Sequence, residues 1–196
     1  MKQNTFLSEL RISIMATIGL VVVLCGIYPL IVWGISQLAF PDQANGSLIR
    51  NGRGEVVGSS LLAQAFDDSI YFQPRPSAAG NGYDAANSSG SNLGSTSQKL
   101  MDQIKARVEA YRQINGLTPN SKVPVDAVTA SSSGLDPHIS YENALLQASR
   151  VARARGISQQ HVVELIRQHT DGRFLGILGE PGVNVLQLNL ALDRKE

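Results

Sequence analysis

Residue types that could support hydrolysis occur together in the segment TASSSGLDPHIS. Ser133, Asp136 and His138 are suited to the roles of nucleophile, orienting carboxylate and general base. A hydrolase serine, however, typically lies in a G-x-S-x-G turn between a strand and a helix, and the segment lacks that turn. Pro137 favours an extended Asp136, which should hold the Asp136 and His138 side chains apart. We predict a structural turn in which Ser140 caps the next helix.

Metal-binding and nucleophilic residue types are otherwise sparse. The single cysteine, Cys25, lies in a long apolar run, so the polar part of the chain has neither a disulfide nor a thiolate. His161 and His169 have no carboxylate at metal-ligand spacing and are predicted to be ordinary surface histidines. The Gly-, Ser- and Asn-rich segment 73–97 lacks the lysine of a G-x-x-x-x-G-K-[ST] phosphate loop. We predict an ordered interaction loop there, stabilised by Asx and Ser turns.

The polar part of the chain follows an apolar run that has no charged residue between Arg11 and Asp42. At about 1.5 Å per residue, a helix of that length spans a hydrocarbon core of about 30 Å. We predict a cytoplasmic head over 1–11, a transmembrane helix over 12–37 and a soluble domain over 38–196. Lys and Arg in the flanks favour an extracytoplasmic soluble domain. A cleaved signal peptide and a buried core helix are the alternatives, although the first has a shorter apolar core and the second keeps a polar stripe.

Small residues recur within the apolar run. Gly19, Gly26 and Gly34 are separated by seven and eight residues, which places them near one face of a helix with 3.6 residues per turn. Such a face lets a second membrane helix approach closely, so a partner helix is predicted. Pro29 lacks a backbone donor and is expected to bend the helix.

The remainder of the chain is predicted to form an α+β domain. Together with the anchor this gives a single N-terminal transmembrane helix followed by one small soluble domain of short strands and about three helices. Helices are expected over 96–115, over 139–155 and from Ser158 to the turn at Asp171. Strands are expected in a hairpin around NGRG, in the run VPVDAV and in the alternating C-terminal run VNVLQLNLALD. The buried face of the second helix is predicted to comprise Ala144, Leu145, Ala148, Val151 and Ala152.

The charge pattern bears on the class of partner. The formal net charge is +1, and the sequence contains no block of like charges. A nucleic-acid-binding domain normally carries a basic patch or stripe, so the sequence gives no electrostatic reason to expect nucleic acid.

A series of short motifs in a fixed order resembles one known family. They are GSLI (46–49), VGS (57–59), Gln64 with Phe66, YF (71–72), RPS (75–77), YD (83–84), SGSNLG (89–94), DAVT (126–129), SGLDPHIS (133–140), and Gln147 with RVA (150–152). The series resembles the C subunit of the bacterial Kdp potassium-transporting ATPase, the KdpC family. Two positions depart from the expected glycine: Ala63 before Gln64, and Ser132 before Ser133.

The resemblance implies a non-catalytic accessory subunit of a high-affinity, ATP-driven potassium importer in the bacterial inner membrane. Its implied partners are a P-type ATPase subunit (KdpB-like), a channel-like potassium-binding subunit (KdpA-like), a small single-helix subunit (KdpF-like) and the lipid bilayer. It also implies a chaperone role that raises the affinity of the ATPase subunit for ATP in a ternary complex, with Gln64 as a nucleotide contact. A membrane-anchored extracytoplasmic hydrolase that uses Ser133, Asp136 and His138, and a stand-alone binding or scaffold module, are the alternatives.

Overall fold

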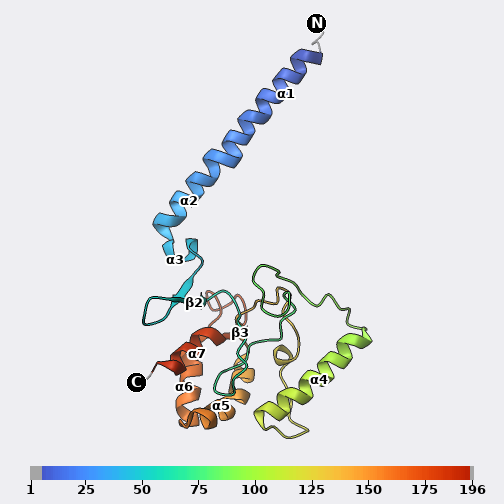
Figure 1. The fold of residues 1–196 in the computed structure, drawn as a ribbon, viewed down its shortest axis with the longest axis vertical. Helices are drawn as coiled ribbons and strands as arrows, with labels where there is room; N and C mark the ends of the chain where they lie inside the picture. Colours follow the sequence, from blue (N-terminus) through green and yellow to red (C-terminus); the bar gives the residue numbers. More distant parts are fainter. Residues whose placement is uncertain (1–5, 195–196) are drawn as a thin grey trace. The chain divides into compact units, whose positions relative to one another are not determined.

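The computed structural model describes residues 6–194, which divide into an N-terminal unit ending at Leu48 and a C-terminal unit beginning at Ile49 (Figure 1). The N-terminal unit contains a long helix from Phe6 to Ala39 and then the short helix α3 (Pro41–Ala44). The long helix comprises α1 (Phe6–Val21), the π-helical stretch η1 (Val22–Ile27) and α2 (Tyr28–Ala39). It is long and apolar enough to cross a membrane, and its most apolar window buries nothing within the structure.

The π-helical stretch changes the predicted arrangement of the small residues. It ends just before Pro29, whose ring and missing N–H disturb the i→i−4 bonding of an α-helix. Because i→i+5 bonding takes more residues per turn than the assumed 3.6, the angle between Gly19 and Gly26 differs from the one that a regular α-helix gives. The common glycine face stays a prediction. All three glycines have open space where a Cβ would lie.

The predicted hairpin around NGRG is confirmed. Strand β1 (Leu48–Arg50) pairs with β2 (Val56–Ser59) in a two-stranded sheet. Oδ1 of Asn51 accepts hydrogen bonds from the backbone N–H groups of Arg53 and Glu55, at 3.0 Å each. The side chain of Asn51 thus satisfies the turn locally, as expected for an Asx turn.

The three predicted helices are also confirmed, as α4 (Gln98–Asn115), α5 (Tyr141–Arg155) and α6 (Gln159–Gln168). Ser140 and Ser158 cap α5 and α6 by accepting hydrogen bonds from the third residue after each of them. Gly116 ends α4 in the left-handed conformation, where glycine carries no Cβ penalty. Ser97 precedes α4, but its side chain makes no capping hydrogen bond.

Two predicted strands are wrong. The run VPVDAV is an extended segment that leads into a single 3-10 turn, η2 (Val125–Ala127). In this turn the carboxylate of Asp126 accepts hydrogen bonds from Ser140 and Asn143 at the start of α5. The alternating leucine run is the helix α7 (Val185–Asp193), capped by Asn184, which accepts from the N–H of Gln187 at 3.1 Å. In that helix the positions i, i+3, i+4 and i+7 carry Val185, Leu188, Asn189 and Leu192, and the polar residue at i+4 conceals the helical period.

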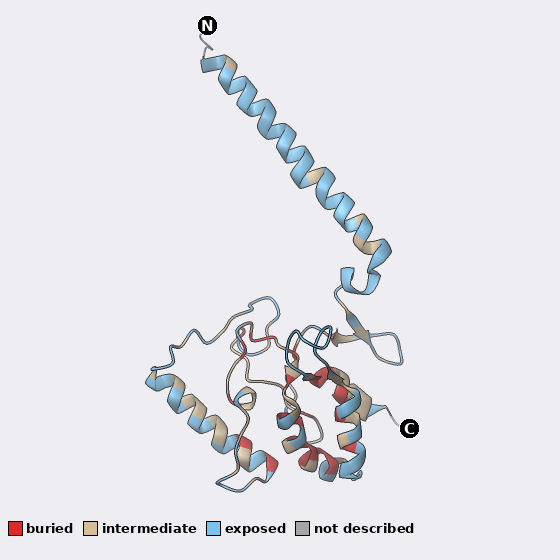
Figure 2. Cartoon of the chain, turned by 180° about the vertical axis from the view of Figure 1, so that it is seen from behind, coloured by how far each residue is buried: buried red, intermediate tan, exposed pale blue. Residues whose placement is uncertain are grey.

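A three-stranded antiparallel sheet and three helices enclose the core of the C-terminal unit. The sheet has the order β3-β5-β4, with β3 (His138–Ile139), β4 (Thr170–Asp171) and β5 (Gly182–Asn184). Helix α5 packs against α4 and α6, and α6 packs against α7. Figure 2 shows that buried residues gather in these helices, whereas the long helix of the N-terminal unit is exposed along its length. Leu145 is exposed at 36% and does not belong to the buried face predicted for α5.

Candidate functional site

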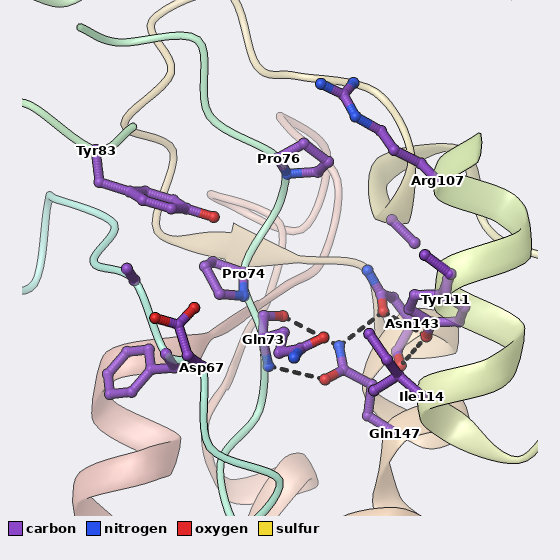
Figure 3. Close-up of a pocket in the computed structure, with 14 residues that line it drawn as sticks. Asp67, Gln73, Pro74, Pro76, Tyr83, Arg107, Tyr111, Ile114, Asn143 and Gln147 are labelled. Atoms are coloured by element: carbon purple, nitrogen blue, oxygen red, sulfur yellow. Dashed lines mark hydrogen bonds between the residues drawn. The ribbon is translucent and has the colours of Figure 1, made fainter. Parts of the chain in front are cut away.

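A pocket of about 220 Å³ lies in the C-terminal unit between α4, α5 and the irregular segment 65–83 (Figure 3). Pro74, Pro76 and Tyr83 line it from the irregular side, and Arg107 and Tyr111 line it from α4. The remaining lining residues are Ala65, Phe66, Asp67, Gln73, Ala110, Ile114, Ala127, Asn143 and Gln147.

Buried amides form one wall of the pocket. Gln147, which is 1% exposed, accepts from the backbone N–H of Gln73 at 2.8 Å and donates to the carbonyl of Gln73 at 3.1 Å. Its Nε2 also donates to Oδ1 of Asn143 at 2.9 Å, and that oxygen accepts from the Tyr111 hydroxyl at 2.8 Å. Burial raises the pKa of Tyr111 well above its ordinary value, so this hydroxyl stays protonated and donates.

The same irregular segment is held from two further helical positions. Arg150 of α5, which is 8% exposed, donates to the carbonyls of Ser69 and Tyr71 and to the side chains of Asn115 and Gln147. On the other side, Asn189 of α7 accepts from the N–H of Phe72 at 2.8 Å and donates to its carbonyl at 2.9 Å.

Side chains therefore take the place of a neighbouring strand along residues 69–73. Gln147 and Asn189 each pair with both backbone groups of one residue, as an adjacent strand would. Buried polar groups are costly unless they are hydrogen-bonded, and these are bonded. In residues 6–194, Nε of Arg75 is the one buried side-chain nitrogen or oxygen without a partner. The wall is thus a fixed structural support, with no free group poised for a reaction.

The loop after Gln73 is ordered, as predicted. The Ser77 hydroxyl donates to the carbonyl of Gly134 at 2.7 Å and accepts from the N–H of Tyr83 at 2.8 Å. Burial raises the pKa of Tyr83 to about 12, and its hydroxyl donates to the carbonyl of Arg75 at 2.9 Å. Gly134 has φ of +69°, and a Cβ there would lie 2.7 Å from the backbone nitrogen of Ala79. Only glycine fits this close approach.

Gln64 lies outside the pocket. Its Nε2 donates to the carbonyl of Val57 on β2 at 3.0 Å. Its amide packs over Gly58, where an added Cβ would collide with both Gln64 and Leu186 of α7. These contacts give the Gln64 side chain a role in joining β2 to the rest of the unit.

The expectation that Pro137 separates Asp136 from His138 is wrong. The backbone N–H of His138 donates to Oδ1 of Asp136 at 3.0 Å, and Nδ1 of the ring lies 3.6 Å from the same oxygen. An Asx-type bond to the residue two positions on is compatible with an extended step, and it draws the two side chains together. On the far side of the ring, Nε2 of His138 lies 3.0 Å from Oδ2 of Asp171 on β4.

The electrostatics of this cluster follow from these contacts. Hydrogen bonding to His138, and then to Arg75 at 2.9 Å, lowers the pKa of Asp136 to about 2 despite partial burial. Hydrogen bonding to Asp136 and Asp171 raises the pKa of His138 above its ordinary value. The cluster therefore favours a charged imidazolium between two carboxylates.

Ser133 is not brought into that cluster. Its Oγ accepts from the N–H of Leu135 at 3.1 Å, and its carbonyl accepts from the N–H of Ser89 at 3.0 Å. Within residues 6–194, Ser133 and His138 share no hydrogen bond. The structure confirms the predicted turn, and Ser133, Asp136 and His138 do not form a relay.

The two remaining histidines, His161 and His169, lie apart from this cluster. Nδ1 of His169 lies 2.9 Å from the carbonyl of Leu165, and His161 is exposed on α6. The described part of the chain contains no group of three or more His, Cys, Asp or Glu residues that could hold a metal ion.

The inward position of the buried amides and of Arg150 was not predicted from the sequence. A signal was present, because Asn143, Gln147 and Arg150 follow the spacing of four and three residues that marks the inward face of a helix.

Comparisons with known proteins agree with one another. A family model described as "KdpC: K+-transporting ATPase, c chain" matches residues 10–194. The chain is 60% identical over 168 residues to the potassium-transporting ATPase KdpC subunit of Mycobacterium tuberculosis (strain H37Rv), which covers 86% of this chain and 88% of the relative. The protein of the same name from Myxococcus xanthus is 52% identical over 195 residues, covering 98% and 89%. That from Rhodospirillum rubrum is 57% identical over 168 residues, covering 86% of each.

Proposed function

Because the chain belongs to the KdpC family, and is a subunit of the potassium-transporting ATPase and not itself a catalytic enzyme, we propose that it stabilises the assembled complex and promotes the use of ATP by the P-type ATPase subunit. The observation that carries the proposal is the family match over residues 10–194 together with a long helix whose apolar surface is left uncovered. Lipid and partner helices are the natural cover for such a surface.

The proposed partners are the KdpB-like ATPase subunit, the KdpA-like channel subunit and the small KdpF-like subunit. The helix would pack against their membrane helices. The C-terminal unit would dock through its ordered surfaces, including the uncharged loop 73–95, whose Asn and Ser side chains can bond a partner's backbone.

The proposed topology is a single pass of the bacterial inner membrane. The head over 1–11 stays in the cytoplasm, residues 12–37 cross the bilayer, and the domain over 38–196 lies in the periplasm. Thiol labelling tests this topology, because replacing Cys25 with serine leaves a chain without cysteine. In that background, Lys122→Cys should react with an impermeant reagent applied to cells whose outer membrane alone is permeabilised. Labelling that requires rupture of the inner membrane would contradict the orientation.

An effect on ATP use can reach the ATPase subunit by two routes. In the first, Gln64 contacts the nucleotide directly, as the family resemblance implies. In the second, the chain favours a conformation of its partners that binds ATP more tightly. The second route is favoured, because Nε2 of Gln64 is already engaged by the carbonyl of Val57 and the proposed topology places Gln64 away from cytoplasmic ATP.

The test is a steady-state ATPase assay on the purified complex, with and without this chain, over a range of ATP concentrations. We expect the apparent KM for ATP to be lower when the chain is present. Gln64→Ala, compared with Gln160→Ala at an exposed position of α6, separates the two routes. A direct contact predicts a raised KM in a fully assembled Gln64→Ala complex, whereas the indirect route predicts an unchanged KM whenever assembly is complete. A KM that is the same with and without the chain would contradict the proposed role.

A further inference from the structure

The connection between β4 and β5 is an apolar hairpin, residues 172–181, whose residues are all exposed. Four large apolar side chains occupy its tip: Phe174 at 70% exposed, Leu175 at 77%, Ile177 at 74% and Leu178 at 57%. Elsewhere in the described part of the C-terminal unit, large exposed apolar residues do not cluster in this way along the chain. Contiguous exposed apolar groups rimmed by polar residues mark interaction sites.

The backbone of the apolar hairpin shows that the exposure is not a loose end. Phe174 and Leu178 exchange backbone hydrogen bonds at 2.8 and 3.0 Å, and the N–H groups of Gly176 and Ile177 bond within the turn. Arg173 and Glu180 close the base with an ion pair at 2.9 Å. The N–H groups of Phe174, Gly176, Ile177 and Leu178 therefore stay paired when the tip is buried against an apolar surface, which lowers the cost of that burial.

Leu175 adds an independent observation. Its φ is +53°, in the left-handed region where glycine, asparagine and aspartate are tolerated better than leucine. At Leu175, therefore, the backbone is strained and the apolar side chain is exposed to water. Strain of this kind concentrates at functional sites, where surrounding contacts offset it.

The charges around the apolar hairpin favour a protein partner over a lipid surface. The charged residues from β4 to β5 are Asp171, Arg173 and Glu180, so the hairpin has no positive excess to attract anionic lipid. An apolar centre with a polar rim of both signs matches the anatomy of a protein interface.

We propose that the apolar hairpin inserts its tip into an apolar groove on another subunit of the same ATPase complex. This inference rests on the proposed function for the existence of that partner, and it assigns the contact to residues 174–178. On docking, the four apolar side chains leave water, and the groove wall supplies the contacts that Leu175 lacks in the isolated unit.

Site-specific photo-cross-linking in intact membranes tests the contact directly. A photoreactive phenylalanine derivative replaces Ile177 in the full chain, co-expressed with the other subunits. The matched control is Val125, which is also β-branched and is 72% exposed on η2. We expect a covalent adduct with one other subunit from position 177 and none with the same subunit from position 125. Adducts confined to lipid or to a second copy of this chain, or no adduct, would overturn the proposal.

A second variant separates docking from folding. Leu175→Asn removes the apolar side chain and suits the positive φ, so the chain should be at least as resistant to thermal unfolding as the wild type. We expect the yield of co-purified partner subunits to fall by about fivefold, as for loss of a contact at the centre of an interface. Unchanged yield would overturn the proposal.

The two experiments also distinguish failure of this inference from failure of the proposed function. If position 177 forms no adduct while the chain still lowers the KM for ATP, this inference alone fails. An adduct without any effect on ATP use contradicts only the proposed function.

Discussion

Two regions of the C-terminal unit reverse the usual distribution of polarity. Around residues 69–73 the interior is filled with amides and a guanidinium, contributed by Asn143, Gln147, Arg150 and Asn189. In the apolar hairpin, by contrast, large apolar side chains face water. Each reversal has a cost, and the difference between them shows where the fold is held internally and where it awaits a partner.

The interior reversal compensates for short strands. The strands of the C-terminal unit are at most four residues long, so most of its non-helical backbone has no neighbouring strand to form hydrogen bonds with. Side-chain amides on α5 and α7 supply the missing donors and acceptors to Phe72 and Gln73. The backbone groups of Phe72 and Gln73 are therefore hydrogen-bonded already in the isolated chain. The apolar side chains of the hairpin, by contrast, would be buried only in a complex.

The largest loss of stability is expected when Arg150 is replaced. Arg150→Met should lower the free energy of unfolding by about 3 kcal/mol, because the carbonyls of Ser69 and Tyr71 and the buried side chain of Asn115 lose their donor. Urea denaturation of the detergent-solubilised full chain measures it. Arg153→Met, at an exposed position of the same helix, is the control and should change stability little. Equal stability of the two variants would show that the buried guanidinium does not hold the segment.

A smaller loss of stability is expected when Asn189 of α7 is replaced. Asn189→Leu makes the inward positions 185, 188, 189 and 192 of the helix all apolar but leaves the N–H and carbonyl of Phe72 buried and unpaired, which should cost about 2 kcal/mol. The same denaturation assay applies, with Gln159→Leu on the exposed face of α6 as the control. An increase in stability would mean that packing outweighs the amide pairing.

A still smaller, pH-dependent effect is expected at His138. Its raised pKa means that its stabilising contribution is fully present below about pH 6.5 and is lost as pH rises through the folded pKa. Because the His138 side chain is 37% exposed, solvent screening limits the loss to about 0.5 kcal/mol. Urea midpoints for wild type and His138→Gln between pH 5.5 and 8.5 should differ more at the acid end. The lowered pKa of Asp136 acts in the opposite sense, because its contribution is lost only as pH falls from about 4 towards 2.

The sequence predicted elements whose signals are local and failed where a distant contact decides. Ser140, Ser158 and Gly116 mark helix ends by short-range bonding, so α4, α5 and α6 were predictable. Asn189 broke the apolar period of α7 because its partner, Phe72, lies far away in the chain. Likewise, the approach of His138 to Asp171 depends on the order of the strands, which no sequence period encodes.

The family and its membrane helix were recognisable from ordered motifs and an uncharged apolar run. The buried amides were harder to identify, since polar residues on a helix are usually assigned to its solvated side. Inward spacing alone does not reveal which backbone groups an amide will bond.

The most direct test of the division between interior and hairpin measures two properties of two variants. For Asn189→Leu and Ile177→Ser, we would determine both the free energy of unfolding of the full chain and the yield of partner subunits that co-purify with it. We predict that Asn189→Leu loses about 2 kcal/mol of stability, whereas Ile177→Ser stays within about 0.5 kcal/mol of wild type and loses its partners. A destabilised Ile177→Ser chain, or one that retains its partners at wild-type yield, would show that the apolar hairpin is not a docking element separate from the core.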